Sequence, residues 1–312
     1  MVSTAIAFVV FNRPDHTAET FAAIRKAQPR QLLVIADGPR PNHPTDAQRC
    51  AAVREIVAQI DWDCDVQYNL ADRNLGCKRR VSSGLDWVFD QVDRAIILED
   101  DCLPHPSFFD YCDALLDRYS QDDRVWAITG NNFQEGQVRG DAAYYFARYF
   151  HCWGWASWRR AWKHYRGDLP FWPDWKTSPN WAALLPDPVE RRYWTKNFDR
   201  VYHNTVDSWA YAWLASIWYG GGLTATPNLN LVRNIGFDEH ATHTRSARSC
   251  YARLKLHPLG PLTHPQHVAV DQVADAYVFE HTFGGRRLRW PRSMLLPPRR
   301  LAAALVNRLR SF

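Results

Sequence analysis

Three consecutive acidic residues that directly follow an apolar run constrain this chain more than any other feature. The run Ala95–Leu98 has the composition of a buried β-strand. The acidic triplet, Glu99, Asp100 and Asp101, follows it without a break. Carboxylates at the end of a buried strand repel one another and lose hydration, so they need a compensating charge. Mg²⁺ or Mn²⁺, completed by substrate phosphates, would supply it; an acidic turn that caps the next helix is the alternative.

The first 130 residues alternate between strand-like and helix-like patterns. The strand-like runs are continuous in Val, Ile, Leu and Ala, which indicates burial on both faces and therefore a mostly parallel sheet. The alternation predicts an α/β fold, in which helices flank a Rossmann-like sheet. Strands are predicted at Thr4–Phe11, Gln31–Ala36, Asp65–Asn69, Arg94–Leu98 and Arg124–Thr129, with helices at about 15–27, 46–59, 79–91 and 106–119.

The pattern changes after Gly130, where the chain becomes rich in aromatic residues. Eleven of the fifteen tryptophans lie between Trp153 and Trp218. We expect most of them in the core and some of them stacked on sugar rings. Further elements are predicted as a strand at Ala142–Phe150, helices at Trp155–Tyr165 and Val206–Tyr219, and strand and loop at Leu223–Phe237. We expect a change of layer within one domain, with halves 1–135 and 136–285 and a basic tail at 286–312.

Cysteine usage and apolar segments bear on the compartment. Seven cysteines, an odd number without any CxxC pair, favour reduced thiols in a cytosolic protein over disulfides or a zinc site. The N-terminal segment has no positive region before its short apolar run, as expected for a first strand and not for a signal peptide. No apolar stretch approaches the roughly 18 residues that span a bilayer. We expect a cytoplasmic protein, peripheral to the membrane at most.

The basic tail at 286–312 carries eight arginines and no acidic residue. From Arg300 onwards it has the pattern of a basic amphipathic helix that lies on an anionic bilayer. We therefore expect salt-sensitive contact with the cytoplasmic face of the inner membrane. A helix that packs on the folded domain with its arginines in water is the alternative. No nucleic-acid partner is expected.

Asp37 follows the second predicted strand and precedes Gly38 and Pro39. The carboxyl ends of parallel strands meet at one edge of the sheet, so its carboxylate should face the same crevice as the acidic triplet. A carboxylate there can accept a hydrogen bond from the ring N–H of a pyrimidine base. An ordinary Asp-Gly turn is the alternative.

A basic cluster of Arg73, Lys78, Arg79 and Arg80 surrounds Gly76 just before a predicted helix. Cations and helix N-termini both favour phosphate, so Arg73 and Lys78 are candidate donor-binding residues. A solvated basic helix face is the alternative. The chain has neither GxGxxG nor GxxxxGK[ST], so dinucleotide binding and P-loop chemistry lack support.

Asp207 precedes the apolar segment SWAYAWLASIWYGG, where we expect it at the N-cap of a buried helix. A carboxylate at the rim of an aromatic pocket can also take the proton of a sugar hydroxyl, which makes Asp207 a candidate general base. His240 and His243 lie in a polar loop, and their spacing is weak evidence for metal or phosphate contact.

These motifs together resemble a GT-A-type glycosyltransferase. ILEDDCLPHPSFFDY closely resembles the variant DxD motif of the inverting N-acetylglucosaminyltransferase I family, in a likeness that covers roughly residues 4–130. The chain is also similar to bacterial glycosyltransferases of surface-polysaccharide loci. That second likeness rests on FNRP at Phe11–Pro14, NLG at Asn74–Gly76, GWASW at Gly154–Trp158 and NIGF…THT at Asn234–Phe237 with Thr242–Thr244.

The resemblance implies a role for each candidate residue. Asp101 would ligate Mn²⁺ (or Mg²⁺) bridging the diphosphate of a nucleotide sugar. Glu99 and Asp100 would contact the sugar and ribose, and Asp37 the uracil of a UDP-linked donor. Asp207 would be the base of a one-step inverting transfer to a glycan or lipid-linked acceptor. The family's acidic pair before tryptophan is Asp-Ser-Trp here, which is a departure from its pattern.

Two other hypotheses remain open. A sugar-nucleotidyltransferase also uses a parallel sheet and acidic metal ligands, but it usually carries a glycine-rich basic loop after the first strand, where this chain has FNRPDH. A non-catalytic carbohydrate-binding protein would use the tryptophans to grip a glycan and would need no nucleotide.

Overall fold

The computed structural model describes residues 2–237 and 254–291 of the 312-residue chain. Its strands are β1 (Ala5–Val10), β2 (Gln31–Ala36), β3 (Asp65–Leu70), β4 (Arg94–Glu99), β5 (Cys102–Pro104), β6 (Val125–Thr129), β7 (Tyr144–Ala147), β8 (Trp155–Trp158), β9 (Leu223–Pro227) and β10 (Val232–Asn234). Its helices are α1 (Pro14–Ala27), α2 (Asp46–Val57), α3 (Cys77–Gln91), α4 (Pro106–Arg118), α5 (Arg159–Trp162), α6 (Trp172–Trp175), α7 (Pro179–Leu184), α8 (Pro188–Tyr202), α9 (Trp209–Tyr219), α10 (Gln272–His281) and α11 (Gly285–Leu288).

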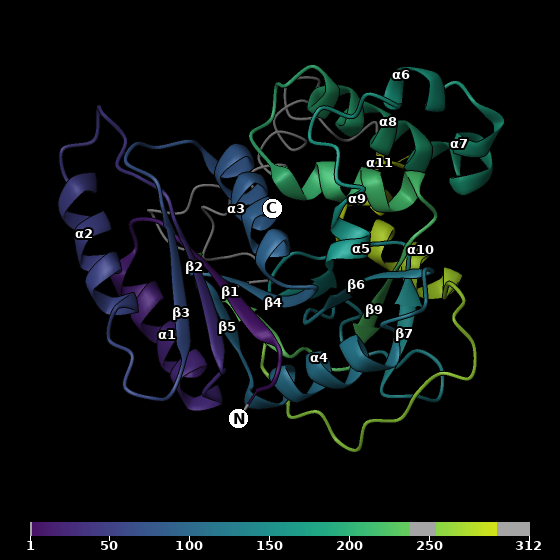
Figure 1. Ribbon diagram of the computed structural model, residues 1–312. Helices are drawn as coiled ribbons and strands as arrows, with labels where there is room; N and C mark the ends of the chain where they lie inside the picture. Colours follow the sequence, from purple (N-terminus) through teal and green to yellow (C-terminus); the bar gives the residue numbers. More distant parts are fainter. Residues whose placement is uncertain (1, 238–253, 292–312) are drawn as a thin grey trace.

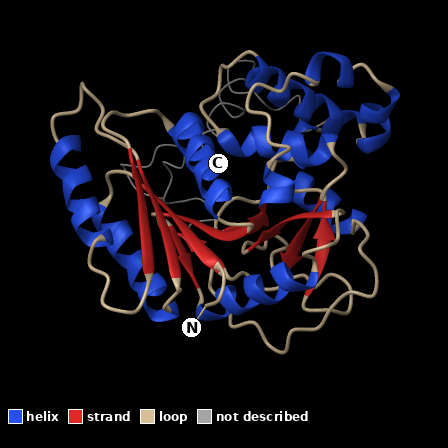
Figure 2. Cartoon of the chain, viewed as in Figure 1, coloured by secondary structure: helices blue, strands red, loops and turns tan. Residues whose placement is uncertain are grey.

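Eight of the strands form one central sheet, in the order β3-β2-β1-β4-β8-β6-β9-β7. Six of them run in the same direction, and β7 and β8 run antiparallel to the rest. Helix α3 covers one face of the sheet and α4 covers the other (Figures 1 and 2). The predicted GT-A-like α/β fold, a mostly parallel sheet flanked by helices, is confirmed.

The central strands are apolar because both of their faces are covered. All six residues of β1 are buried, and β2 and β4 are buried over most of their length. In α3, Gly84 allows close contact with β2, since a Cβ built there would lie 2.5 Å from Cγ2 of Ile35. The carboxyl ends of β1, β2 and β4 therefore form a fixed edge on which polar residues can be placed.

The prediction of a helix at Trp155–Tyr165 was wrong in its first part. Trp155–Trp158 forms strand β8, which pairs antiparallel with both β4 and β6. Its continuous apolar sequence fits a buried strand as well as a buried helix, and pairing on both sides decides between them. Gly154, at a φ of +66°, begins this turn into the sheet, and a Cβ there would lie 2.7 Å from Cγ2 of Val232.

The proline-rich segment after residue 169 holds helices that the sequence analysis did not predict. Pro179 and Pro188 each stand at the start of a helix, α7 and α8, where the missing amide hydrogen costs nothing. The side chains of Ser178 and Asp187 cap these helices by accepting from Trp181 and Val189. These two prolines therefore begin helices.

Most of the tryptophans belong to the core, as expected. Five of them are among the largest fully buried side chains: Trp155, Trp172, Trp181, Trp194 and Trp213. Trp213 belongs to α9, whose side chains are buried from Trp209 to Trp218 except at Ala210. Trp155, Trp181 and Trp194 contact aromatic rings of that helix. Stacking on sugars is therefore restricted to aromatic residues at a cavity wall.

Several expectations concern parts of the chain that the structure leaves undescribed. His240, His243 and Thr242–Thr244 lie outside the described residues, as does the tail from residue 292. No described helix has the length and hydropathy of a membrane span.

The six described cysteines are free thiols. The boundary near residue 135 stays a prediction; strands from both expected halves share the central sheet.

Candidate functional site

A cavity of about 350 Å³ lies at the carboxyl ends of β1, β2 and β4. The order of the sheet reverses at β1, and open α/β sheets bind ligands at such a reversal. The rest of the wall comes from the start of α3 and from residues 152–153, 207–210 and 234–236. Five candidate site residues line this cavity: Asp37, Glu99, Asp100, Asp101 and Asp207.

The two candidate phosphate-binding cations lie elsewhere. Neither Arg73 nor Lys78 is part of the cavity wall. Arg73 is exposed, and Lys78 is half-buried with its Nζ donating to Oδ1 of Asn204 at 3.1 Å. Arg80, from the same basic cluster, is buried and donates through Nε to the carbonyl of Ala36 at 3.2 Å. The basic cluster therefore serves partly to hold α3 on the sheet.

Arg13, in the turn between β1 and α1, is a counter-charge to the acidic triplet. Its NH1 donates to Oδ2 of Asp101 at 2.8 Å and lies 3.8 Å from Oδ1 of Asp100. Oδ2 of Asp100 also accepts from the amide of Phe11 at 3.2 Å. The end of β1 thus supplies the donors that hold two of the three carboxylates.

The acidic triplet carries more negative charge than Arg13 balances. Burial raises the pKa of Glu99 to about 8, with repulsion from Asp101 and Asp100 adding to it. Burial likewise raises the pKa of Asp100 to about 6, against the opposing effect of Arg13. Burial and mutual repulsion therefore both favour the neutral form of Glu99.

The small sheet of β5 and β10 covers the acidic triplet from the other side. β5 begins directly after Asp101, and the amide of Ile235, just past β10, donates to the carbonyl of Asp101 at 2.8 Å. A Cβ built on Gly236 would lie 2.4 Å from Oδ2 of Asp101 and 2.9 Å from NH1 of Arg13. Only glycine fits against this ion pair.

The acidic triplet fits a divalent cation held together with a ligand. Among the described residues, no group of three or more His, Cys, Asp or Glu side chains forms a complete metal site. Mg²⁺ is commonly held by one or two carboxylates plus substrate phosphates. Asp101 offers a carboxylate in the cavity wall, and the unbalanced negative charge around it favours a cation.

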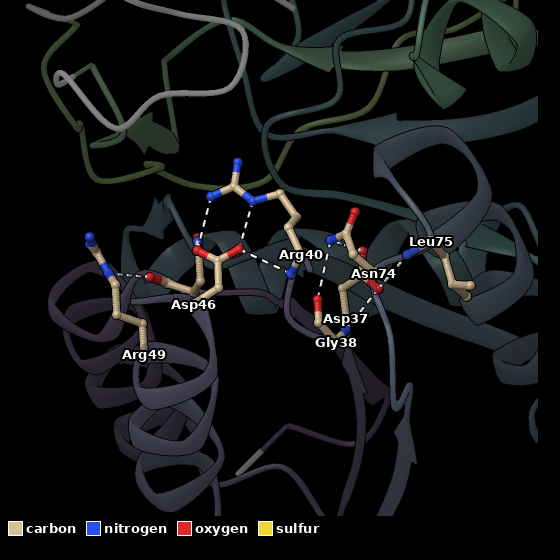
Figure 3. Close-up of polar contacts among 8 residues, drawn as sticks. Asp37, Gly38, Arg40, Asp46, Arg49, Asn74 and Leu75 are labelled. Carbon is tan, nitrogen blue, oxygen red and sulfur yellow. Dashed lines mark hydrogen bonds and ion pairs between the residues drawn. The ribbon is translucent and has the colours of Figure 1, made fainter. Parts of the chain in front are cut away.

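Asp37 is engaged in hydrogen bonds within the protein. Its Oδ1 accepts from the amides of Gly38 and Leu75, each at 2.9 Å, and its Oδ2 accepts from Nδ2 of Asn74 at 2.9 Å (Figure 3). Burial raises its pKa, and the amides of Leu75 and Gly38 oppose that change. Asp37 therefore ties the loop before α3 to the end of β2.

Arg40 reaches the cavity from the loop after β2 and is fixed by Asp46 at the start of α2. Nε and NH2 of Arg40 donate to the two carboxylate oxygens of Asp46 at 2.6 and 3.0 Å (Figure 3). Asp46 also accepts from Nδ2 of Asn12 at 2.8 Å, and Arg40 holds its pKa at about 2. The guanidinium lies 5.4 Å from the ring centre of Phe11.

Asp207 was expected at the N-cap of α9, and this prediction was wrong. The N-cap of α9 is Ser208, and the Asp207 carboxylate caps α3 instead. Its Oδ2 accepts from the amide of Cys77 at 3.1 Å and its Oδ1 from the amide of Lys78 at 2.8 Å. The first turn of α3 has no cap of its own from Gly76, so the fold supplies one from a distant segment.

The cavity wall also contains polar residues that were not predicted as site residues, among them Arg13, Arg40 and Asn74. Arg13 lies in FNRPDH after β1, Arg40 follows Asp37–Pro39 after β2, and Asn74 begins NLG after β3. Position directly after a buried strand was the available signal. Which side chain turns inwards depends on partners such as Asp101 and Asp46, which the local sequence does not reveal.

Residues 73–182, about a third of the chain, match the model of the GNT-I family, the N-acetylglucosaminyltransferase I family. The match includes the acidic triplet and the start of α3, but neither Asp37 nor Asp207. It supports the predicted class, a GT-A-type glycosyltransferase that uses a nucleotide sugar. Among curated proteins no relative is found.

Three solved structures show limited similarity. UDP-glucose pyrophosphorylase complexed with UDP-glucose is 10% identical over 47% of this chain, with a TM-score of 0.27, and the chain spans 62% of that protein. HddC from Yersinia pseudotuberculosis is 7% identical over 55% of this chain and 85% of its own, with a TM-score of 0.32. The 4-diphosphocytidyl-2C-methyl-D-erythritolsynthase from Anaerococcus prevotii is 9% identical over 57% and 77%, also with a TM-score of 0.32. These similarities are too weak to carry a functional conclusion.

Proposed function

We propose that this protein is a metal-dependent, inverting glycosyltransferase that moves a sugar from a UDP-linked donor to a glycan or lipid-linked acceptor. The observation that carries the proposal is one cavity that gathers the acidic triplet, Asp37 and Asp207 at the carboxyl ends of the strands. The family match over residues 73–182 supports the same class of enzyme. The motifs shared with surface-polysaccharide glycosyltransferases favour an acceptor of that kind.

In this proposal the acidic triplet receives the diphosphate end of the donor. Asp101 would hold Mn²⁺ or Mg²⁺, which neutralises charge on the departing diphosphate when it is bound. Asp100 contacts the ribose. Glu99 contacts a sugar hydroxyl from the cavity wall. Arg13, which already pairs with Asp101, adds positive charge beside the phosphates.

Asp207 acts as the general base. The acceptor hydroxyl oxygen attacks the anomeric carbon, and the bond from that carbon to the phosphate oxygen breaks. The nucleoside diphosphate leaves with the electron pair, and the hydroxyl proton passes to Asp207. Each carboxylate oxygen of Asp207 accepts one amide hydrogen bond and keeps a further lone pair for this proton.

The test is release of UDP by the full-length protein from UDP-sugars, with Mn²⁺ and an oligosaccharide or lipid-linked acceptor. We expect the wild type to turn over, a chelator to abolish this turnover and added Mn²⁺ to restore it. The variant Asp101→Ala should show no turnover. Asp123→Ala, an exposed acid far from the cavity, serves as the matched control. Metal-dependent turnover that survives in Asp101→Ala would refute the metal assignment.

Two other outcomes would favour the alternative functions. Pyrophosphate release from UTP and a sugar phosphate, without sugar transfer, would favour a nucleotidyltransferase. A protein that binds glycan but no UDP would be a carbohydrate-binding protein.

Peripheral contact with the cytoplasmic face of the inner membrane, through the basic tail at 286–312, is part of the proposal. Its eight arginines and the absence of acids favour an anionic lipid surface. Sedimentation with anionic vesicles should capture the full chain at low salt and less of it at high salt. Equal capture of a variant that lacks residues 292–312 would refute the role of the tail.

A further inference from the structure

We propose that Asn74 reads the base of the nucleotide donor and that Asp37 is the residue that positions it. This inference rests on the proposed function, since it assigns the base contact within the same cavity. It replaces the contact between Asp37 and the base that the sequence resemblance implied. The starting observation is the Asn74 side-chain amide, whose nitrogen faces Asp37 and Gly38 (Figure 3).

The orientation of the Asn74 amide follows from its partners. Nδ2 donates to Oδ2 of Asp37 at 2.9 Å and to the carbonyl of Gly38 at 3.2 Å. A carboxylate and a carbonyl accept hydrogen bonds and donate none, so the nitrogen must face them and the oxygen must face away. Asn74 lines the cavity, and no donor from the described residues contacts its Oδ1. The cavity thus contains an acceptor of fixed direction.

The loop that carries Asn74 is held firmly against the end of β2. The backbone amide of Asn74 donates to the carbonyl of Pro39 at 3.3 Å. The next backbone amide, that of Leu75, donates to Oδ1 of Asp37. A Cβ on Gly38 would lie 2.5 Å from the backbone nitrogen of Arg73, so the two loops are in direct contact. Both oxygens of Asp37 accept hydrogen bonds from this loop, so Asp37 fixes the orientation of Asn74.

Arg40 supplies a donor in the same wall. Its Nε and NH2 are engaged by Asp46, which leaves NH1 without a partner among the described residues. An acceptor of fixed direction, Oδ1 of Asn74, is complementary to the ring N–H that uracil presents at N3. Cytosine has a lone pair at N3 instead, so the two acceptors would face each other. We infer that the cavity selects uracil over cytosine.

The experiment measures binding of UDP and of CDP to the full chain by calorimetry in the presence of Mn²⁺. The wild type should bind UDP at least about tenfold more tightly than CDP, because CDP leaves polar groups unpaired. Asn74→Ala should bring the two affinities within about threefold of each other. Asp72→Ala, an exposed residue of the same loop, should keep the wild-type preference. Asp37→Asn should also lower the preference, since it no longer forces the amide nitrogen inwards.

The ratio of the two affinities separates base reading from a general loosening of the loop, which would weaken both nucleotides equally. A tenfold preference that persists in Asn74→Ala, or a wild type that binds both nucleotides equally, would overturn the role of Asn74 and leave the proposed function standing. A wild type that binds neither nucleotide would overturn both. If Asn74→Ala does not fold, UDP methylated at N3 tests the same contact in the wild type, because the methyl group removes the ring N–H. This nucleotide should bind about tenfold more weakly than UDP. Equal binding of the two nucleotides would overturn the inference.

Discussion

The carboxylate of Asp207 accepts a hydrogen bond of 2.8 Å from the amide of Lys78, 129 positions earlier in the chain. This bond, with a second from Cys77, joins the segment before α9 to the first turn of α3. The helix N-terminus is electropositive, so the carboxylate stabilises it. Asp207 therefore has a structural role in addition to any role in catalysis.

Replacement of Asp207 separates these two roles. Asp207→Ala should lower the free energy of unfolding by about 1 kcal/mol through loss of the cap, and Asp207→Asn by less, because one acceptor remains. Both variants should bind UDP and fail to transfer sugar. Asp271 caps α10, because its Oδ1 accepts from the amide of Ala274 at 2.8 Å. As a control, Asp271→Ala should lower the free energy of unfolding by a similar amount and leave sugar transfer intact. Full transfer by Asp207→Asn would exclude the general-base role.

Gly236→Ala tests the close contact between β10 and the acidic triplet. The new Cβ, 2.4 Å from Oδ2 of Asp101, must displace that carboxylate or the backbone, at a cost of about 1–3 kcal/mol. We expect lower stability and loss of metal-dependent UDP binding. Gly260→Ala, where a Cβ meets nothing within 4 Å, should behave as wild type. Denaturant unfolding and calorimetry measure both effects; unchanged UDP binding in Gly236→Ala would contradict the placement of the donor.

Glu99 should make stability depend on pH. Its pKa rises from 4.5 in the unfolded chain to about 8 in the folded protein, so the folded state holds the proton over this interval. Stability contributed by this group should therefore fall as pH rises from about 4.5 to 8. Glu99→Gln cannot ionise and should lack this component. Unfolding of both proteins in urea across this range gives the comparison, and parallel pH profiles would show that Glu99 ionises normally.

The ion pair between Arg148 and Asp275 should contribute far more to stability than an exposed pair. Asp275 is fully buried and accepts from Nε of Arg148 at 2.8 Å. Asp275→Ala would leave a largely buried guanidinium without its counter-charge, at a cost of about 3–5 kcal/mol. Asp117→Ala removes the exposed partner of Arg94 and should cost less than about 1 kcal/mol. Urea unfolding midpoints, converted with a constant m-value, give the loss in free energy of unfolding for each variant. Equal losses in Asp275→Ala and Asp117→Ala would contradict the larger contribution of the buried pair.

The sequence predicted what depends on local pattern. The apolar strands and the acids at the end of β4 could be located because strand ends carry polar residues into one crevice. The helical interpretation of Trp155–Trp158 failed because four buried residues do not distinguish a strand from a helix. Pairing with β4 and β6 is a tertiary property, and it determined the outcome.

The partners of the site residues could not be predicted from the sequence. Asp207 lies next to α9 in the chain, yet the fold brings the amides of α3 to it. Asp37 lies in the cavity wall, and the loop at Asn74 donates hydrogen bonds to both of its oxygens. Arg13 and Arg40 enter the cavity because Asp101 and Asp46 hold them there. Each of these contacts joins different loops, and local residue preferences carry no record of them.

The position of Gly236 has a consequence for the order in which the site is assembled during synthesis. The acidic triplet is made early, but β10 and Gly236, which cover it, come only after about three quarters of the chain. Until then β5 lacks its strand partner, and the cavity wall lacks Asn234 and Gly236. A ribosome-bound fragment that ends before β10 should therefore contain the acidic triplet but no closed cavity.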